Sequence, residues 1–273
     1  MSALHQIHAR ITSAIQDVLT RTGYDGSTPL NEWLRTTAGG NYAKLLGRST
    51  KVDKGLKQGV LTAIVYMSPA SEAGINMCPW ATAGCAAACL GHSSGRLRYA
   101  KSKIARIKKT LRYHLFREEF LADLRSELGK FVKKATRQGK RPAIRLNGST
   151  DILWEKTGIV QEFPELTFYD YTKAPRRNAP ANYHLTYSIS ERASSWATAT
   201  EYLDRGGNAA LVVRNATQAA HVVKHGYKGY PAVDGDLTDI RFDDAAGHVV
   251  VLYAKGAGIN DTSGFVQDIE VQA

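Results

Sequence analysis

Short apolar runs recur from about residue 60 to the end of the chain, and most of them are followed by polar residues. They cover residues 61–67, 143–146, 166–171, 183–189, 209–213, 230–233 and 248–253. Helix-like stretches at residues 97–138, 159–162, 190–204 and 217–224 lie between them. This alternation is typical of parallel βα units. Because there are seven such runs, the pattern predicts an α/β fold, a (β/α) TIM-like barrel that is closed or partial, rather than a doubly wound sheet.

The first 58 residues follow a different pattern. Apolar residues repeat at helical spacing over residues 4–21, and a second short helix is expected over residues 30–46, interrupted at Gly39 and Gly40. We therefore predict an N-terminal helical extension over residues 1–58 and a barrel with a metal-binding cysteine loop over residues 59–273, in a single domain overall. The sequence has no GxGxxG motif after a strand and no GxxxxGK(S/T) motif, so neither nucleotide fingerprint supports a doubly wound sheet.

Positive charge is concentrated in one stretch. The net charge is +11, and residues 96–145 hold seventeen Lys/Arg against four Asp/Glu, so the other residues sum to about −2. Such a bias is typical of a surface that binds nucleic-acid phosphates, and the alternative is a solvated helix with snorkelling lysines. The cations predicted to contact nucleic acid, which we expect to be double-stranded DNA, are Arg96, Arg98, Lys101, Lys103, Arg106, Lys108, Lys109, Arg112 and Arg145.

No segment predicts a membrane location. The sequence lacks a run of about 18 apolar residues, as a membrane-spanning helix requires, and its first residues lack the apolar region of a signal peptide. We expect the chain to stay in the cytoplasm. Thiols are reduced there, and clustered cysteines indicate metal binding or catalysis more often than disulfides.

Cys78, Cys85 and Cys89 are the only cysteines, and they lie in one Gly/Ala-rich loop directly after the first apolar run. Three thiolates and one histidine form a closed tetrahedral zinc site. The candidates for the fourth ligand are His114, which we place in the predicted site, and His92. Three thiolates alone would instead hold a 4Fe–4S cluster and leave one iron open for a small ligand. Three small buried cysteines without metal are the remaining alternative.

Polar residues follow several predicted strands. In α/β barrels the reacting groups come from the carboxyl ends of the strands and the loops after them. The predicted catalytic residues at these positions are Asp151, Asp170, Lys173, Asp234 and Asp236. A carboxylate there acts as a nucleophile at a sugar carbon, or as a general acid or base. Turn or helix-cap roles are the alternative for Asp151 and Asp236.

Further strand-end residues form the predicted substrate pocket. They are Asn147, Ser149, Tyr171, Ser188, Arg214 and Lys255. Lys173 and Lys255 would neutralise a phosphate or a developing anion. Tyr169, Tyr171 and Trp154 are candidates for stacking on a base taken out of a duplex, with an ordinary place in the core as the alternative.

Several of these residues lie in motifs that resemble the gene-product-88-like family, which is found widely in bacteriophage genomes. The similar stretches are NMCP at 76–79, GCAAACL at 84–90, RLNGSTDI at 145–152, FYDYTK at 168–173, NYHLTYS at 182–188 and DTSGFV at 261–266. The resemblance spans about residues 50–266. It implies a phage setting, and thus the cytoplasm of an infected bacterial host, but supplies no reaction. Many cellular relatives carry a second cysteine cluster near the C-terminus, which this sequence lacks.

Two weaker resemblances suggest a reaction. Queuine-type transglycosylases, which exchange guanine for a 7-deazaguanine in tRNA or phage DNA, are barrels with a Cys3His zinc site and aspartate nucleophiles. The interval between Cys89 and His114 is similar to theirs, although their zinc site lies late in the chain. Radical S-adenosylmethionine enzymes carry their cluster loop after the first barrel strand, but their usual CxxxCxxC spacing differs from the Cx6CxxxC spacing found here.

The leading hypothesis is therefore a phage transferase that modifies bases in nucleic acid, with DNA expected. It would exchange a small-molecule base through a glycosyl–enzyme intermediate at Asp151 or Asp170, and its zinc would be structural. The alternative is a radical S-adenosylmethionine enzyme with a 4Fe–4S cluster that acts on nucleic acid. A second alternative is a non-catalytic, zinc-stabilised DNA-binding protein, which leaves the polar strand ends unexplained.

Overall fold

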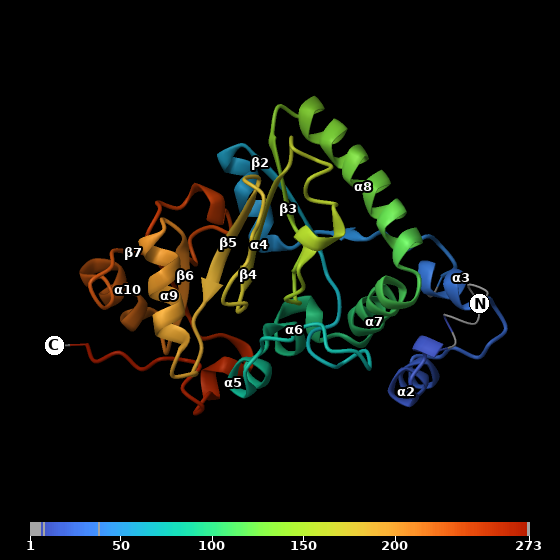
Figure 1. Cartoon of the computed structure of the whole chain (residues 1–273), viewed down its shortest axis with the longest axis horizontal. Helices are drawn as coiled ribbons and strands as arrows, with labels where there is room; N and C mark the ends of the chain where they lie inside the picture. The colour runs from blue at the N-terminus through green and yellow to red at the C-terminus, as the bar shows by residue number, and fades with distance from the viewer. Residues whose placement is uncertain (1–6, 8, 38, 272–273) are drawn as a thin grey trace.

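One eight-stranded, mostly parallel sheet is the centre of the structure (Figure 1). The structure is a computed structural model and describes residues 7, 9–37 and 39–271. The strands are β1 (Leu46–Gly47), β2 (Val60–Val65), β3 (Arg141–Arg145), β4 (Thr167–Thr172), β5 (Tyr183–Ser188), β6 (Asn208–Val213), β7 (Ala232–Asp234) and β8 (Val249–Tyr253). Their order is β1-β2-β3-β4-β5-β6-β8-β7, and β1 pairs antiparallel with β2 while the other described pairings are parallel.

The sheet confirms the predicted α/β class, and each of the seven predicted runs contains or overlaps a strand. The closed form of the predicted barrel is not found. β1 and β7 stand at opposite ends of the strand order, and no pairing among the described strands joins them. These edge strands have only two and three residues, so each offers few hydrogen-bonding groups for closure.

Helices flank the sheet. They are α2 (Ser13–Arg21), α3 (Leu30–Arg35), α4 (Thr50–Asp53), α5 (Ala83–Ala87), α6 (Leu90–Ser93), α7 (Ala100–Leu115), α8 (Arg117–Arg137), α9 (Ser195–Asp204) and α10 (Ala216–His225), and the 3-10 turns are η1 (Lys54–Gln58), η2 (Gly95–Arg98), η3 (Trp154–Thr157), η4 (Arg241–Asp243) and η5 (Gly256–Asn260). α8 packs on β3, α9 on β5 and β6, and α10 on β6, β7 and β8. No described helix is both long and apolar enough to cross a membrane.

Three helix predictions need correction. The stretch at residues 97–138 is two helices, because the backbone leaves the helical region at Phe116 (φ −128°, ψ 56°). The helix expected over residues 30–46 ends at Arg35, and residues 46–47 join the sheet as β1. Residues 159–162 form turns rather than a helix. Of the helix predicted over residues 4–21, residues 4–6 and 8 lie outside the described part, and α2 covers the end.

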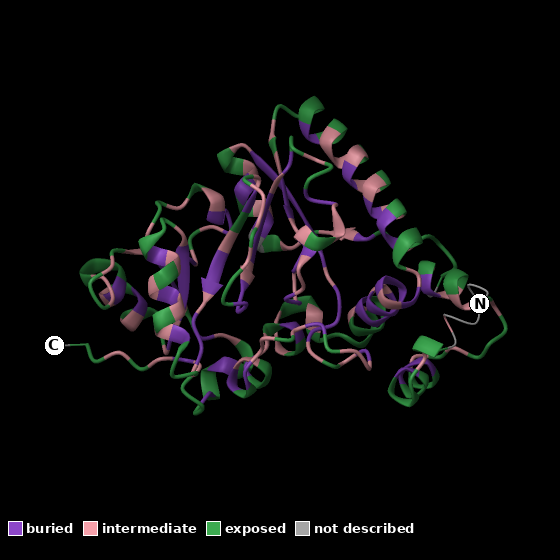
Figure 2. Ribbon diagram, viewed as in Figure 1, coloured by how far each residue is buried: buried purple, intermediate pink, exposed green. Residues whose placement is uncertain are grey.

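The apolar core divides along the sheet. One cluster joins β2, β3 and β4 to the inner face of α8, through residues such as Ile144, Phe168 and Leu124. Another joins α2 and α3 to α7 through Ile15, Leu34 and Leu111. Figure 2 shows α7 largely buried and the outer face of α8 exposed. The N-terminal helices are therefore packed onto the helix that follows the cysteines.

Candidate functional site

The three cysteines lie on a loop beneath the carboxyl ends of the parallel strands, where Figure 1 shows α5 and α6. We call residues 78–92 the cysteine loop. Two caps build it locally. Asn76 Oδ1 accepts a hydrogen bond from the N–H of Cys78 at 2.9 Å, and Thr82 Oγ1 accepts one from the N–H of Cys85 at 3.2 Å to begin α5. Such side-chain caps satisfy helix and turn donors that would otherwise lack partners.

Segments that follow three different strands hold this loop and the residue just before it. After β3, the N–H of Asp151 donates to the carbonyl of Met77 at 2.9 Å. After β5, the carboxylate of Glu191 accepts from Thr82 Oγ1 at 2.7 Å and from the N–H of Gly84 at 2.8 Å. Just beyond the loop, Ser93 Oγ accepts from the N–H of Ala257, after β8. The loop is thus fixed at the edge where parallel α/β proteins bind ligands.

Each cysteine sulfur accepts backbone hydrogen bonds. The donors are the N–H of Ala70 for Cys78, with 3.3 Å between N and Sγ, that of Thr82 for Cys85, and those of Gly91 and His92 for Cys89. Burial raises the pKa of all three thiols, that of Cys78 to about 12. Interaction with the sulfurs of Cys89 and Cys85 further raises the pKa of Cys78, and interaction with Cys85 raises that of Cys89. Amide donors around thiolates are a feature of metal–thiolate and iron–sulfur sites.

The two histidines that are candidates for the fourth metal ligand make different contacts. The ring of His92 lies 3.4 Å from Glu72, measured from Nδ1 to Oε1, and its backbone N–H serves Cys89. His114 lies near the end of α7, and its carbonyl accepts from Arg10 at 3.4 Å. The ring of His114 is partly buried and lies near Arg10 and Arg117. Within the described residues, no group of three or more His, Cys, Asp or Glu side chains has the arrangement of a formed metal site.

Asp151 and Lys173 lie beside the cysteines. Asp151 is 8% exposed, and its carboxylate accepts from Thr172 Oγ1 and from the N–H of Lys173, both at 2.8 Å. Lys173 Nζ donates to Ser188 Oγ at 2.6 Å and to the Ser188 carbonyl at 3.2 Å. Burial lowers the pKa of Lys173, while Cys85 and Asp151 act in the opposite direction. The structure therefore brings predicted catalytic and pocket residues to one place, next to Cys85.

Asp170 is fully buried and does not open onto this place. Its carboxylate accepts from the N–H groups of Leu146 and Asn147 at 3.2 and 3.0 Å, and from Tyr183 Oη at 2.8 Å. Burial raises the pKa of Asp170 to about 7. This arrangement fits a carboxyl group that joins β3, β4 and β5 rather than one that contacts a substrate.

Other predicted pocket and stacking residues are engaged in the fold. Asn147 is buried and its Oδ1 accepts from Thr150, Ile152 and Trp154. Trp154 and Tyr169 are completely buried, so the core alternative holds for both. Ser149 Oγ donates to the carbonyl of Met67.

The remaining strand-end residues lie after β6, β7 and β8. Asp234 Oδ1 accepts from the N–H of Asp236, so the side chain of Asp234, and not that of Asp236, makes the turn bond here. Asp236 pairs with Lys255. Arg214 binds Asp268 at 3.0 Å and donates to the carbonyl of Asp261, so it fastens the C-terminal segment to the end of β6.

Five of the nine cations predicted to contact nucleic acid are turned inward, which contradicts that prediction for them. Arg106, Lys108 and Arg112 are buried. Lys108 and Lys109 donate to the carbonyls of Thr36 and Leu45, and the guanidinium of Arg145 pairs with Asp239 at 3.0 Å. For the four cations on α7, the reason is that the N-terminal helices and the neighbouring loops cover this part of the helix, so its long side chains reach backbone carbonyls and carboxylates instead of water. Arg145 is buried because it lies in β3.

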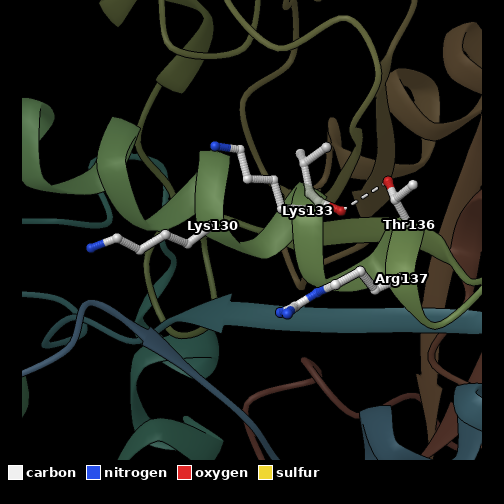
Figure 3. A pocket seen from close by; sticks show the side chains of 5 residues that line it. Lys130, Lys133, Thr136 and Arg137 are labelled. Carbon is white, nitrogen blue, oxygen red and sulfur yellow. Dashed lines mark hydrogen bonds between the residues drawn. The ribbon is translucent and has the colours of Figure 1, made fainter.

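Two separate groups of exposed cations lie within residues 96–145. Arg96, Arg98, Lys101 and Lys103 are exposed just beyond the cysteine loop, with Lys103 paired to Glu72 at 3.2 Å. A second group lies on the last turns of α8, where Lys130, Lys133 and Arg137 extend around a hollow of about 540 Å³ (Figure 3). α8 leads into the amino end of β3, so this hollow lies at the opposite edge of the sheet from the cysteines (Figure 1).

Sequence reasoning missed two groups that position the loop. Glu191 follows β5 as Asp151 follows β3, so the same strand-end rule would have selected it. Arg106 donates to the carbonyls of Gly91 and Leu97 at 3.0 and 2.8 Å, which ties α7 to the loop. No sequence signal separates Arg106 from its basic neighbours, because only burial distinguishes them.

The fold and the site define an α/β protein with a mostly parallel sheet and a three-cysteine loop at its carboxyl edge. The chain belongs to the gene product 88 family, whose model matches residues 39–269. No match was found among the curated proteins or among the solved structures.

Proposed function

We propose that this protein is a nucleic-acid-modifying enzyme in which Cys78, Cys85 and Cys89 hold a 4Fe–4S cluster, with S-adenosylmethionine as co-substrate. The single observation that carries the proposal is the set of three neighbouring sulfurs, each with backbone N–H donors, on a loop after the first parallel strand. The contacts described for the rings of His92 and His114 lie elsewhere, which favours a three-thiolate donor set over Cys3His zinc.

The cysteine environment fits such a group. Thiolates bind the irons of these clusters, and amide donors to the sulfurs tune them. When bound, a cluster of this kind supplies one-electron chemistry to its co-substrate. The ammonium of Lys173 beside Cys85 would offset part of the negative charge of the thiolates.

Nucleic acid is the proposed substrate class because exposed cations border the loop. Arg96, Arg98 and Lys101 follow it directly and are exposed, where they would bind phosphates close to the cysteines. The net charge of +11 would favour approach to a polyanion. The setting that we propose is a bacterium infected by phage, and the reaction would take place in its cytoplasm.

Purification without oxygen, followed by assays of iron, zinc and sulfide, tests the proposal. We expect a brown protein with about four irons and four sulfides per chain. Cys85→Ser should lose most of the iron, whereas the matched variant His114→Gln should retain it. About one zinc without iron, lost in His114→Gln, would overturn the cluster.

Base exchange is the second candidate, because Asp151 is a positioned carboxylate at the same edge of the sheet. Both of its oxygens are held, by Thr172 and by the backbone of Lys173. It would attack the sugar carbon of a nucleotide while the three cysteines and a histidine hold a structural zinc.

Incorporation of labelled guanine into DNA and into tRNA tests this second candidate. Asp151→Asn should abolish incorporation, by at least about 100-fold, and leave DNA binding intact. Asp17→Asn, an exposed position on α2, is the control and should behave as wild type. Equal incorporation by both variants would remove Asp151 from the reaction, and DNA binding without any covalent change would favour the non-catalytic alternative.

A further inference from the structure

A hollow of about 300 Å³ lies between the start of α9, the turn after α10 and the C-terminal segment. The residues that matter for its chemistry are Glu191, Arg192, Trp196, Tyr227, Lys228 and Gln267. Its size is at the lower end of the range for ligand pockets, which suits one small ligand rather than a duplex. It adjoins the cysteine loop through Glu191.

The charge that this hollow offers to a ligand is positive. Arg192 and Lys228 are both exposed on its rim. The guanidinium of Arg192 donates a long hydrogen bond, of 3.4 Å, to the carbonyl of Ala81. The carboxylate of Glu191 accepts from Thr82 and Gly84 on the side of the cysteine loop, and its single negative charge offsets only one of the two cations. Two such cations at one pocket mouth suit a phosphate.

The wall of the hollow is aromatic. The rings of Trp196 and Tyr227 meet edge to face, with 5.2 Å between centroids and 85° between planes. Lys228 Nζ lies 4.8 Å from the centroid of the Trp196 ring. A cation over an indole face is a favourable contact, and aromatic side chains are the surfaces on which proteins stack nucleobases. The amide of Gln267 adds a donor and an acceptor for a base edge.

The backbone at Lys228 has an unusual left-handed conformation. Its φ is +49°, one of two described non-glycine residues with positive φ. The turn around it is fixed by backbone hydrogen bonds that Tyr227 and Tyr230 exchange at 2.9 and 3.0 Å. A non-glycine residue in the left-handed region persists where surrounding structure holds it, often at ligand sites. The turn therefore keeps the ammonium beside the indole.

We infer that this hollow binds one nucleotide, with the base on Trp196 and the phosphate between Arg192 and Lys228. Binding of the nucleotide does not depend on the proposed function. Its interpretation as one unit of the nucleic-acid substrate does rest on that function. Arg192 and Glu191 contact the loop at residues 81–84, so a nucleotide held there would lie next to the proposed cluster.

Calorimetric titration with deoxyguanosine 5′-monophosphate tests the site. We expect binding to wild type, and at least about tenfold weaker binding to Arg192→Ala/Lys228→Ala. The control is Lys133→Ala/Arg137→Ala, which removes the same charge at the distant hollow of Figure 3 and should bind as wild type. Deoxyguanosine and inorganic phosphate alone should each bind more weakly than the nucleotide.

Two results would overturn the inference: no binding at about 10 mM nucleotide, or equal losses in the two double variants. Binding by Cys85→Ser, which has no complete cluster site, separates this inference from the proposed function, because the nucleotide should still bind if the cluster proposal fails. Competition with a ten-nucleotide single-stranded DNA shows whether the bound nucleotide is a unit of a strand or a free nucleotide. Displacement of the mononucleotide supports a unit of a strand, and no displacement supports a free nucleotide.

Discussion

At the scale of single residues, Gly84 is the position where the segment around Ser263 and Phe265 packs most closely against the cysteine loop. A Cβ at this position would lie 2.1 Å from Ser263 Oγ and 2.9 Å from both Phe265 Cβ and Glu191 Oε1. Glycine is therefore required by close approach and not by a special backbone angle. Its neighbour Cys85 is held in place by the same packing.

Gly84→Ala should lower the free energy of unfolding by about 1–3 kcal/mol, because the added methyl must displace Ser263 and Phe265. Gly129→Ala is the matched control. Gly129 lies within α8 and a Cβ there meets nothing within 4 Å, so this variant should gain up to about 1 kcal/mol. Urea unfolding measures both. Changes of the same sign in the two variants would contradict the packing argument.

Single residues also show how far the sequence could lead to the site. The cysteines were found from their spacing, and Asp151 and Lys173 from their places after strands. Asp170 satisfies the same rule, yet three donors and complete burial set it apart from Asp151. Position along a strand predicts the edge of the sheet to which a residue goes. It does not predict which carboxylates pack inside, because partners such as Tyr183 come from other strands.

At the scale of elements, α7 is a basic helix in which Lys101 and Lys103 near its start are exposed, while the charges from Arg106 to Arg112 face the protein. Lys108 Nζ donates to the carbonyl of Thr36 at 2.7 Å and lies 4.0 Å from the ring centroid of Trp33. Burial lowers the pKa of Lys108 and of Lys109 to about 8. The folded protein therefore releases these protons at lower pH than the unfolded chain does.

This difference predicts how stability depends on pH. Between about pH 8 and 10 the unfolded chain binds more protons at these lysines than the folded protein, so their contribution to the free energy of unfolding should rise with pH, opposite in sign to the contribution of the three buried thiols. The expected rise is on the order of 2 kcal/mol. Lys108→Met/Lys109→Met should abolish most of it, whereas Lys133→Met/Lys134→Met, on exposed turns of α8, should retain it. An unchanged rise in the first variant would show that the two ammonium groups are solvated.

Elements were predicted unevenly, and for physical reasons. Strands buried on both faces, such as β2 with six buried residues, are continuous apolar runs that the sequence displays directly. The break between α7 and α8 was missed because Leu115, Phe116 and Arg117 continue the helical periodicity across it. β1 was missed because two residues carry no periodic signal. Counting charges located the basic helices but could not tell that α7 is covered and α8 is not.

At the scale of the whole molecule, the carboxyl edge collects segments from the entire chain. The cysteine loop comes from the first half, Asp151, Lys173 and Glu191 from the middle, and residues 257–265 from the end. The two groups of exposed cations lie at opposite edges of the sheet. Only the group next to the cysteine loop is placed to bind a substrate at the carboxyl edge. The sequence could not show which of the two groups this is, because both fall within residues 96–145.

The contact between the cysteine loop and the C-terminal segment also sets an order of events during synthesis. About 180 residues separate Cys89 from Asp268, so at about 5–20 residues per second the ribosome needs roughly 10–35 s to deliver the last neighbours of the thiols. During this interval the three sulfurs emerge without Ser263, Phe265 or the anchor that Arg214 gives to Asp268. The nascent chain therefore exposes the three thiols before these contacts have formed, and the site can be completed only after the segment that holds Ser263, Phe265 and Asp268 has been synthesised.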